Sequence, residues 1–299
     1  MTSRSIVLAA MVFPPALSIL PTQLAAAPAI NYSDFTSVAG LQLNGTAAQN
    51  ATSVRLTNSA EMQAASVFVT TPQDVTHDFS MTYSFTITSP GDNGFAALNG
   101  VQYGPNGADG LAFVITGDTR GSSSLGEAGG ELGYGHFVSS NNPIAIQHSL
   151  AVALRTYVYN RIDLFDDLAN PNLSISYQST PIATQTGTLP AIIGIPQTVN
   201  VSYVAATDQL TVLLNGNSIG LDNVTLPAPL SSIVDGNAGY FGFTAATGGA
   251  WSTIDLSSFT ATGVPEPASL TLLVLGGGAL LMRRRKLAHR HRSSEVIPR

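Results

Sequence analysis

The chain has 299 residues, no cysteine and a formal net charge of −6, and only 10% of its residues are charged. The absence of cysteine excludes disulfide bonds, so a hydrophobic core must provide the stability. Eight of the twelve basic residues lie in the first 26 or the last 17 positions, which leaves residues 27–263 with four arginines, sixteen acidic residues and a charge near −12. This middle segment offers no basic face for nucleic acid.

The N-terminal segment, residues 1–26, predicts a signal peptide. Arg4 gives a positive start, residues 6–20 are almost wholly apolar, and residues 24–27 include small side chains suited to cleavage. A membrane anchor or a buried strand is the alternative, but the apolar run is short for a membrane span. We therefore expect export through the inner membrane.

The middle segment, residues 27–263, predicts a single all-β domain. Apolar and polar residues alternate at 79–87, 173–177 and 199–203, which indicates strands with one buried face. The continuous apolar runs at 111–115 and 150–154 indicate strands that are buried on both faces. Asn215-Gly216 after the run 211–214 favours a tight hairpin. Short strands separated by turn residues, with no amphipathic helix of any length, predict a sandwich or a barrel.

Three motifs follow one another in the middle segment. They are Gly107-Ala-Asp-Gly-Leu-Ala-Phe-Val-Ile115, Gly129-Gly-Glu-Leu-Gly-Tyr-Gly135 and Leu150-Ala-Val-Ala-Leu-Arg-Thr-Tyr157. In this order and spacing they resemble the motifs of the legume-type (L-type, concanavalin-like) lectins. Weaker likenesses at 31–45 and 239–259 extend the resemblance over most of the middle segment. The resemblance implies a concanavalin-like antiparallel β-sandwich, or jelly roll, that binds sugar.

The resemblance also assigns residues to a sugar site. It implies that Asp109 accepts hydrogen bonds from sugar hydroxyls and that Gly129 or Gly130 donates a backbone N–H. An ionised carboxylate is a pure acceptor, which suits adjacent hydroxyl groups. In this family the peptide bond before the aspartate is often cis. The alternative is that Asp109 is an ordinary turn residue before Gly110.

Further sugar contacts are expected from the loops near this aspartate. Tyr159, Phe165 and Trp251 lie near the sugar-facing loops of the family, and an aromatic ring can stack on the apolar face of a sugar. Each of them has a place in the core as its alternative. The family's metal-binding asparagine falls at position 159, so Asn160, one residue away, is also a candidate.

Most metal-binding positions of the family carry other residues in this chain. Ala153 and Arg155 stand where a glutamate and an aspartate are expected, Asn172 stands in place of the histidine, and Asp167 aligns with the second aspartate. One carboxylate therefore remains where three are expected, whereas calcium usually takes six to eight oxygen ligands. The sequence predicts no bound metal, with calcium as the alternative if this irregular loop aligns differently.

Arg155 then needs another partner, because an unpaired buried guanidinium is strongly destabilising. The lectin geometry places Arg155 beside Asp167. We expect an ion pair between these two residues to replace the metal ions, with Asp163 and Asp166 as further candidate partners.

The C-terminal tail, residues 264–299, has three parts. Val264-Pro-Glu-Pro267 is followed by an apolar run at 268–282 and by Arg283-Arg-Arg-Lys286. The run is short for a span, which makes it a short apolar helix at most. This order resembles the PEP-CTERM sorting signal of Gram-negative bacteria. The resemblance implies transient retention in the inner membrane and cleavage by a sorting protease, an exosortase, with a simple tail anchor as the alternative.

Three functions are compatible with this organisation. The first is a non-enzymatic, secreted or surface-held protein that binds envelope or matrix polysaccharide without a cofactor. The second is a structural matrix protein on a lectin fold that no longer binds sugar, which Ala153 and Arg155 favour. The third, a glycoside hydrolase, requires two carboxylates about 5–9.5 Å apart. Because the sequence contains no Glu-x-Asp-x-Glu strand, we favour the first, while the sugar and the oligomeric state stay open.

Overall fold

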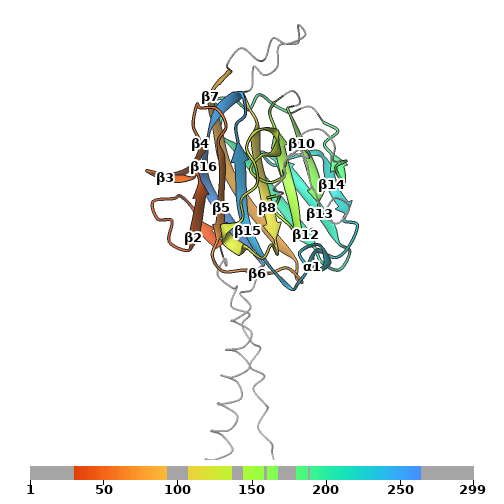
Figure 1. The fold of residues 1–299 in the computed structure, drawn as a ribbon. Helices are drawn as coiled ribbons and strands as arrows, with labels where there is room; N and C mark the ends of the chain where they lie inside the picture. The colour runs from red at the N-terminus through yellow and green to blue at the C-terminus, as the bar shows by residue number, and fades with distance from the viewer. Residues whose placement is uncertain are drawn as a thin grey trace, which may run out of the picture.

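A computed structural model of the chain describes residues 30–92, 107–136, 144–157, 160–167, 180–187 and 189–263. These residues form two antiparallel β-sheets packed face to face, with one helical turn, α1 (Leu230–Ile233) (Figure 1). The predicted all-β sandwich is therefore confirmed. The predicted leader, the tail and the strand at 173–177 lie outside the described residues. In the part that is described, no helix is long and apolar enough to cross a bilayer.

The first sheet is built around the longest strand of the domain. In spatial order it contains β14 (Asn217–Thr225), β13 (Gln209–Leu214), β12 (Gln197–Val204), β7 (Phe79–Asp92), β16 (Ala250–Thr262), β4 (Ser53–Thr57) and β3 (Ala48–Asn50), with β1 (Ile30–Tyr32) also paired to β16. The turn between β13 and β14 contains Asn215 and Gly216, both at positive φ. Asn-Gly accepts this conformation readily, which explains the predicted hairpin.

The second sheet carries the motifs that resemble the lectin site. In spatial order it contains β11 (Ala183–Thr184), β10 (Arg161–Asp166), β9 (Ser149–Arg155), β8 (Gly110–Thr116), β15 (Ala238–Ala246), β5 (Ala64–Val69) and β2 (Leu41–Gly45), with β6 (Gln73–Asp74) also paired to β15. Strands distant in sequence become neighbours, since β8 lies between β9 and β15.

The main core lies between the two sheets. Along β7 every second side chain is buried, from Phe79 to Ile87, as the alternation predicts. The centre of the core is aromatic, and the ring of Phe243 lies 4.8 Å from the ring centroids of both Tyr83 and Phe259. This layer provides the apolar burial that a cysteine-free chain requires.

A second, smaller core covers the outer face of the second sheet. The side chains of Ala112, Ala151, Ala153 and Phe165 face outward there, beneath a covering segment, residues 118–147, of which 137–143 are not described. Tyr134 from this segment is fully buried and its hydroxyl lies 2.8 Å from that of Ser149. The covering segment explains why β8 and β9 are buried on both faces, as their continuous apolar runs predict.

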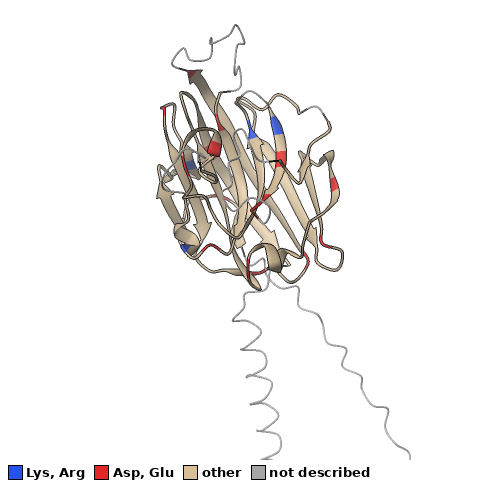
Figure 2. Ribbon diagram, turned by 45° about the vertical axis from the view of Figure 1, so that its right-hand side comes forward, with Lys and Arg blue, Asp and Glu red and all other residues tan. Residues whose placement is uncertain are grey.

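The two ends of the described domain meet at one pole of the sandwich. Ile30 of β1 pairs with Ala261 of β16, next to the start of β7. The other end of β7 is at the opposite pole, where Gly91 pairs with Trp251. Few basic residues are visible on the ribbon, and the acidic ones are scattered over it rather than gathered on one face (Figure 2).

Candidate functional site

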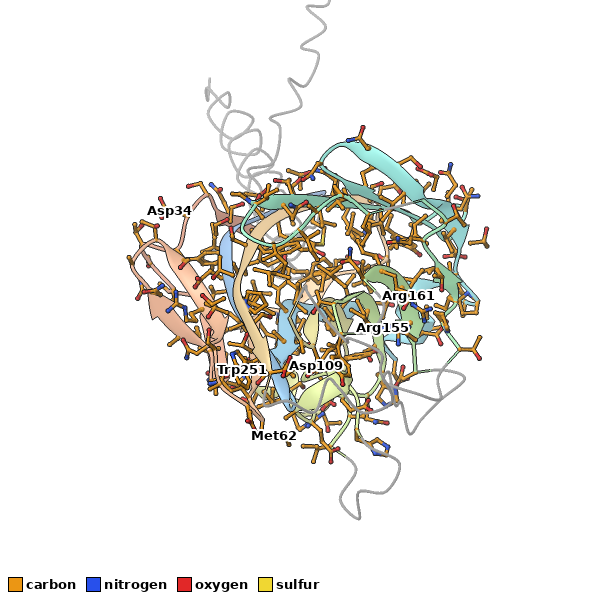
Figure 3. The ribbon with its side chains drawn as sticks, turned by 90° about the horizontal axis from the view of Figure 1, so that it is seen from above. Asp34, Met62, Asp109, Arg155, Arg161 and Trp251 are labelled. Carbon is orange, nitrogen blue, oxygen red and sulfur yellow. The ribbon has the colours of Figure 1, made fainter. Side chains whose placement is uncertain are left out.

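Asp109 lies at the pole formed by the end of β7, directly before β8. The peptide bond between Ala108 and Asp109 is cis. The Asp109 N–H donates to Ala246 O at 2.8 Å, and its carbonyl accepts from Thr156 N at 2.9 Å. The backbone of Asp109 is thus fixed between β15 on one side and the end of β9 on the other. Figure 3 shows this end of the molecule with Asp109 near Trp251 and Met62.

Glycines allow the backbone to approach the Asp109 side chain closely. A Cβ atom on Gly248 would lie 3.1 Å from Asp109 Oδ2 and 3.3 Å from the Cα of Gly129. Gly129 has φ +69°, a conformation that favours glycine, and its N–H donates to Thr247 O at 2.9 Å. Two loops that are far apart in sequence therefore meet beside one carboxylate.

The carboxylate of Asp109 is electrostatically unusual. Its residue is only 5% exposed, and burial raises the pKa of Asp109 to about 7. The nearby backbone N–H of Gly248 opposes this rise in pKa, and the charge of Glu131 adds to it. Oδ2 has no hydrogen-bond partner in the described part of the chain. A buried acceptor without a donor is costly, and such atoms commonly mark a functional site.

Two further buried polar atoms lie at the neighbouring ends of β9 and β10, where Arg155 pairs with Arg161. Thr156 Oγ1 and Asn160 Oδ1 are buried and accept no hydrogen bond from the described residues. The N–H of Gly129 is used, but that of Gly130 has no acceptor within the same described ranges. We call Asp109, Gly129, Gly130, Thr156, Asn160 and Gly248 the Asp109 cradle. Its free acceptors and its free donor suit a ligand rich in hydroxyl groups, because a hydroxyl both donates and accepts.

Arg155 is buried as predicted, but its ion-pair partner is the alternative, Asp163, and not Asp167. Its side chain is 8% exposed, and its Nη2 and Nε lie 2.5 and 2.7 Å from Asp163 Oδ2. Arg161 Nε lies 2.7 Å from the same oxygen, and Thr184 donates to Asp163 Oδ1 at 2.8 Å. Arg155 also lies over the ring of Phe165, 5.7 Å from its centroid. A fully buried aspartate thus holds two guanidinium groups.

Strand register explains why Asp163 replaces Asp167 as the partner. Strands β9 and β10 are antiparallel, with Asp163 opposite Ala153 and Asp166 opposite Leu150. Asp167 therefore lies beyond the far end of the ladder, roughly 20 Å along the strand from Arg155. There its carboxylate accepts hydrogen bonds from the backbone N–H groups of His148 and Ser149.

The residues at the expected metal positions do not fit a metal ion. Ala153 has no ligand atom, and the guanidinium of Arg155 stands at the position of an expected carboxylate. The carboxylate closest to these positions, Asp163, is already neutralised by two arginines. Across the described ranges, no group of three or more histidine, cysteine, aspartate or glutamate residues is arranged to hold a metal. Asn172 lies outside those ranges.

The structure describes two of the three aromatic candidates, Phe165 and Trp251. Phe165 is 1% exposed and belongs to the second core, so the sugar-facing position considered for it is wrong. Trp251 packs over Gly91, where a Cβ atom would lie 2.6 Å from the indole Nε1. Tyr159 is outside the described residues. Sequence reasoning also missed Thr156 and Gly248, because only the pairing of distant strands brings them to Asp109.

Comparisons with known proteins agree with this fold. The model of the legume lectin domain family matches residues 28–273. A Bauhinia forficata lectin in complex with GalNAc is 21% identical with a TM-score of 0.57, over 78% of this chain and 97% of that one. Winged bean acidic lectin complexed with methyl-α-D-galactose is also 21% identical, with a TM-score of 0.58 over 79% and 98%. The Ca²⁺/Man3GlcNAc-bound exoplasmic/lumenal domain of VIP36 is 18% identical, with a TM-score of 0.53 over 79% and 88%.

Proposed function

Because the chain belongs to the legume lectin domain family, we propose that it is a carbohydrate-binding protein whose Asp109 cradle works without a metal ion. The observation that carries this proposal is the buried Asp109 Oδ2, which lacks a donor beside the unfilled atoms of Thr156 and Asn160. Sugar hydroxyls would donate to Asp109 and accept from the N–H of Gly130. The Arg155–Asp163 ion pair would hold the end of β9 next to Thr156 in place of bound metal ions.

We further propose that the protein is exported and held transiently at the inner membrane before its release to the cell surface. The apolar leader and the three-part tail support this route, with an exosortase as the processing partner. The ligand would then be an envelope or matrix polysaccharide. No catalytic role is included, because recognition by the cradle requires only hydrogen bonds.

A glycan array tests the binding function. The full chain should bind a subset of glycans equally well in calcium and in EDTA, because the cradle contains no metal ligand set. Asp109→Asn should lose this binding, since an amide cannot replace both acceptor oxygens. Binding that EDTA abolishes would overturn the metal-independent site.

A second function is favoured by the loss of the metal ligands at Ala153 and Arg155. A lectin fold that has become a structural matrix protein would bind no glycan on the array at any calcium concentration. That result would reject the carbohydrate-binding proposal.

A further inference from the structure

Met62 is the most exposed large hydrophobic side chain of the described residues, at 66%. It lies in the loop of residues 58–63 between β4 and β5, at the same pole as Asp109 (Figure 3). A single exposed apolar residue is ordinary on a protein surface. Its backbone is not ordinary, because Met62 has φ +53°, a left-handed conformation that is uncommon for residues other than glycine, asparagine and aspartate.

Four hydrogen bonds fix this loop against the Asp109 cradle. Met62 N donates to Gly248 O at 3.0 Å, and Gln63 N donates to Thr247 Oγ1 at 3.0 Å. Thr247 donates in return, from its N–H to Gln63 O at 2.9 Å and from its hydroxyl to Ala60 O at 2.7 Å. The left-handed conformation is therefore held in place by its surroundings. Strained residues that are held in this way cluster at binding sites.

Met62 is also linked to the carboxylate of Asp109 through a single residue, Gly248. It bonds to Gly248, and Gly248 is the glycine whose Cβ would meet Asp109 Oδ2 at 3.1 Å. A saccharide has a polar rim and an apolar C–H face. The cradle matches only the rim. Phe165 packs in the second core, and the ring of Trp251, at the same pole as Asp109 (Figure 3), packs over Gly91.

We propose that Met62 is the apolar platform of the carbohydrate site and packs on the C–H face of a saccharide held by Asp109. The proposal rests on the proposed function and adds a residue that determines affinity. A thioether side chain is flexible and polarisable, so it adapts to sugar rings of different shape. The apolar surface of the platform is covered only when the ligand binds.

The substitution Met62→Asn tests this role without disturbing the loop. Asparagine accepts the left-handed conformation better than methionine does, so the thermal midpoint should not fall. The probes are methyl α-D-galactoside, N-acetylgalactosamine and a mannose-terminated oligosaccharide, titrated into the full chain by calorimetry. Binding of whichever probes the wild type binds should weaken roughly three- to tenfold, the effect of losing a few tens of Å² of apolar contact.

Two control variants separate the platform from general effects. Met62→Leu keeps the apolar surface and should bind within about twofold of the wild type, the spread expected for a volume-conserving apolar exchange. Val204→Asn removes another exposed apolar side chain, 40% exposed, at the opposite pole, where its neighbour Tyr203 pairs with Phe79. That pole is roughly 40 Å from Gly91 along β7, so binding should not change.

Oxidation provides a test on the unmutated chain. Of the five methionines, Met62 and Met81 are the two within residues 27–263, and Met81 is only 1% exposed. Mild peroxide should convert Met62 to its sulfoxide, which is polar, and weaken binding as Met62→Asn does. Methionine sulfoxide reductase should restore the affinity. Peroxide should not change saccharide binding by the Met62→Leu variant, although its other methionines are still present.

The outcomes distinguish the two proposals. If saccharide binds and Asp109→Asn abolishes binding, but Met62→Asn and peroxide leave the affinity unchanged, the platform is wrong and the carbohydrate site stands. If neither the array nor the three probes show any binding, the proposed function fails and the platform fails with it.

Discussion

At the scale of single residues, the burial of Asp109 makes the stability of the fold depend on pH. Between the ordinary pKa of an aspartate and about 7, the folded protein keeps a proton on Asp109 that the unfolded chain releases. The free energy of unfolding therefore falls as pH rises through this range. In the proposed site, sugar hydroxyls would donate to the ionised form, so affinity should increase with pH up to about 7 and then level off.

Asp109→Asn should separate these two properties. At pH 8 the substitution removes a buried carboxylate that is ionised there and has no partner at Oδ2, and it should stabilise the fold by up to about 4 kcal/mol. At pH 4 the stabilisation should vanish. Urea unfolding at both pH values measures the difference, and a variant less stable than the wild type at pH 8 would contradict the role of burial.

Arg155→Ala should destabilise the domain by about 3–5 kcal/mol, because it leaves the fully buried Asp163 with one guanidinium fewer. Arg161→Ala is the matched control. Arg161 is 32% exposed and shares the same oxygen, so its loss should cost clearly less. Thermal unfolding of the wild type should be the same in calcium and in EDTA, and a rise in melting temperature with calcium would refute the ion pair as a substitute for metal.

At the scale of elements, the covering segment depends on Arg120. Its guanidinium forms a two-point contact with Asp118, at 2.6 and 3.0 Å, and donates to the carbonyls of Leu125, Ile144 and Ala145. One side chain thus joins the start and the end of the segment that closes the second core. Nothing in the sequence pattern singles out Arg120 for this task.

Arg120→Ala should therefore loosen the covering segment and lower the free energy of unfolding by about 2–3 kcal/mol, because three carbonyls lose the guanidinium donor and Asp118 keeps only its backbone donors, the N–H groups of residue 120 and Gln147. Hydrogen exchange should show lost protection in residues 121–136 while the first sheet stays protected. Arg55→Ala breaks the more exposed Arg55–Asp255 pair, which should cost no more than about 1 kcal/mol. Equal effects of both substitutions would contradict the role of Arg120 in holding the covering segment.

The elements were more predictable than their contacts. The alternation of apolar and polar residues predicted β7 and β12, and continuous apolar runs predicted β8 and β9. Burial on one face or on two faces determines which of these patterns a strand has. The lectin-like motif led to Asp109. The sequence offered Asp163 only as an alternative to Asp167, because the choice between them depends on the register of β9 and β10. The proximity of Met62 to Gly248 could not be predicted, since it follows from contacts between segments that are distant in the chain.

At the scale of the whole molecule, we expect the fold to be complete without residues 264–299. Removing residues 264–299 should leave a domain with an unchanged thermal midpoint and a far-UV spectrum typical of β-structure, because both sheets are closed within residues 30–263. The truncated protein should no longer fractionate with membranes. A truncated chain that failed to fold would show that the tail belongs to the core.

The pairing of β1 with β16 places the ends of the domain at the pole opposite the Asp109 cradle. Both ends of the described domain lie next to the start of β7, while the Asp109 cradle and Met62 lie where β7 finishes. Fourteen residues of β7, roughly 45 Å of extended chain, separate the two poles. A bead or a fused enzyme attached at residue 30 or at residue 263 would therefore lie at the pole away from the proposed sugar site. We expect a domain immobilised at either position to keep that site unobstructed.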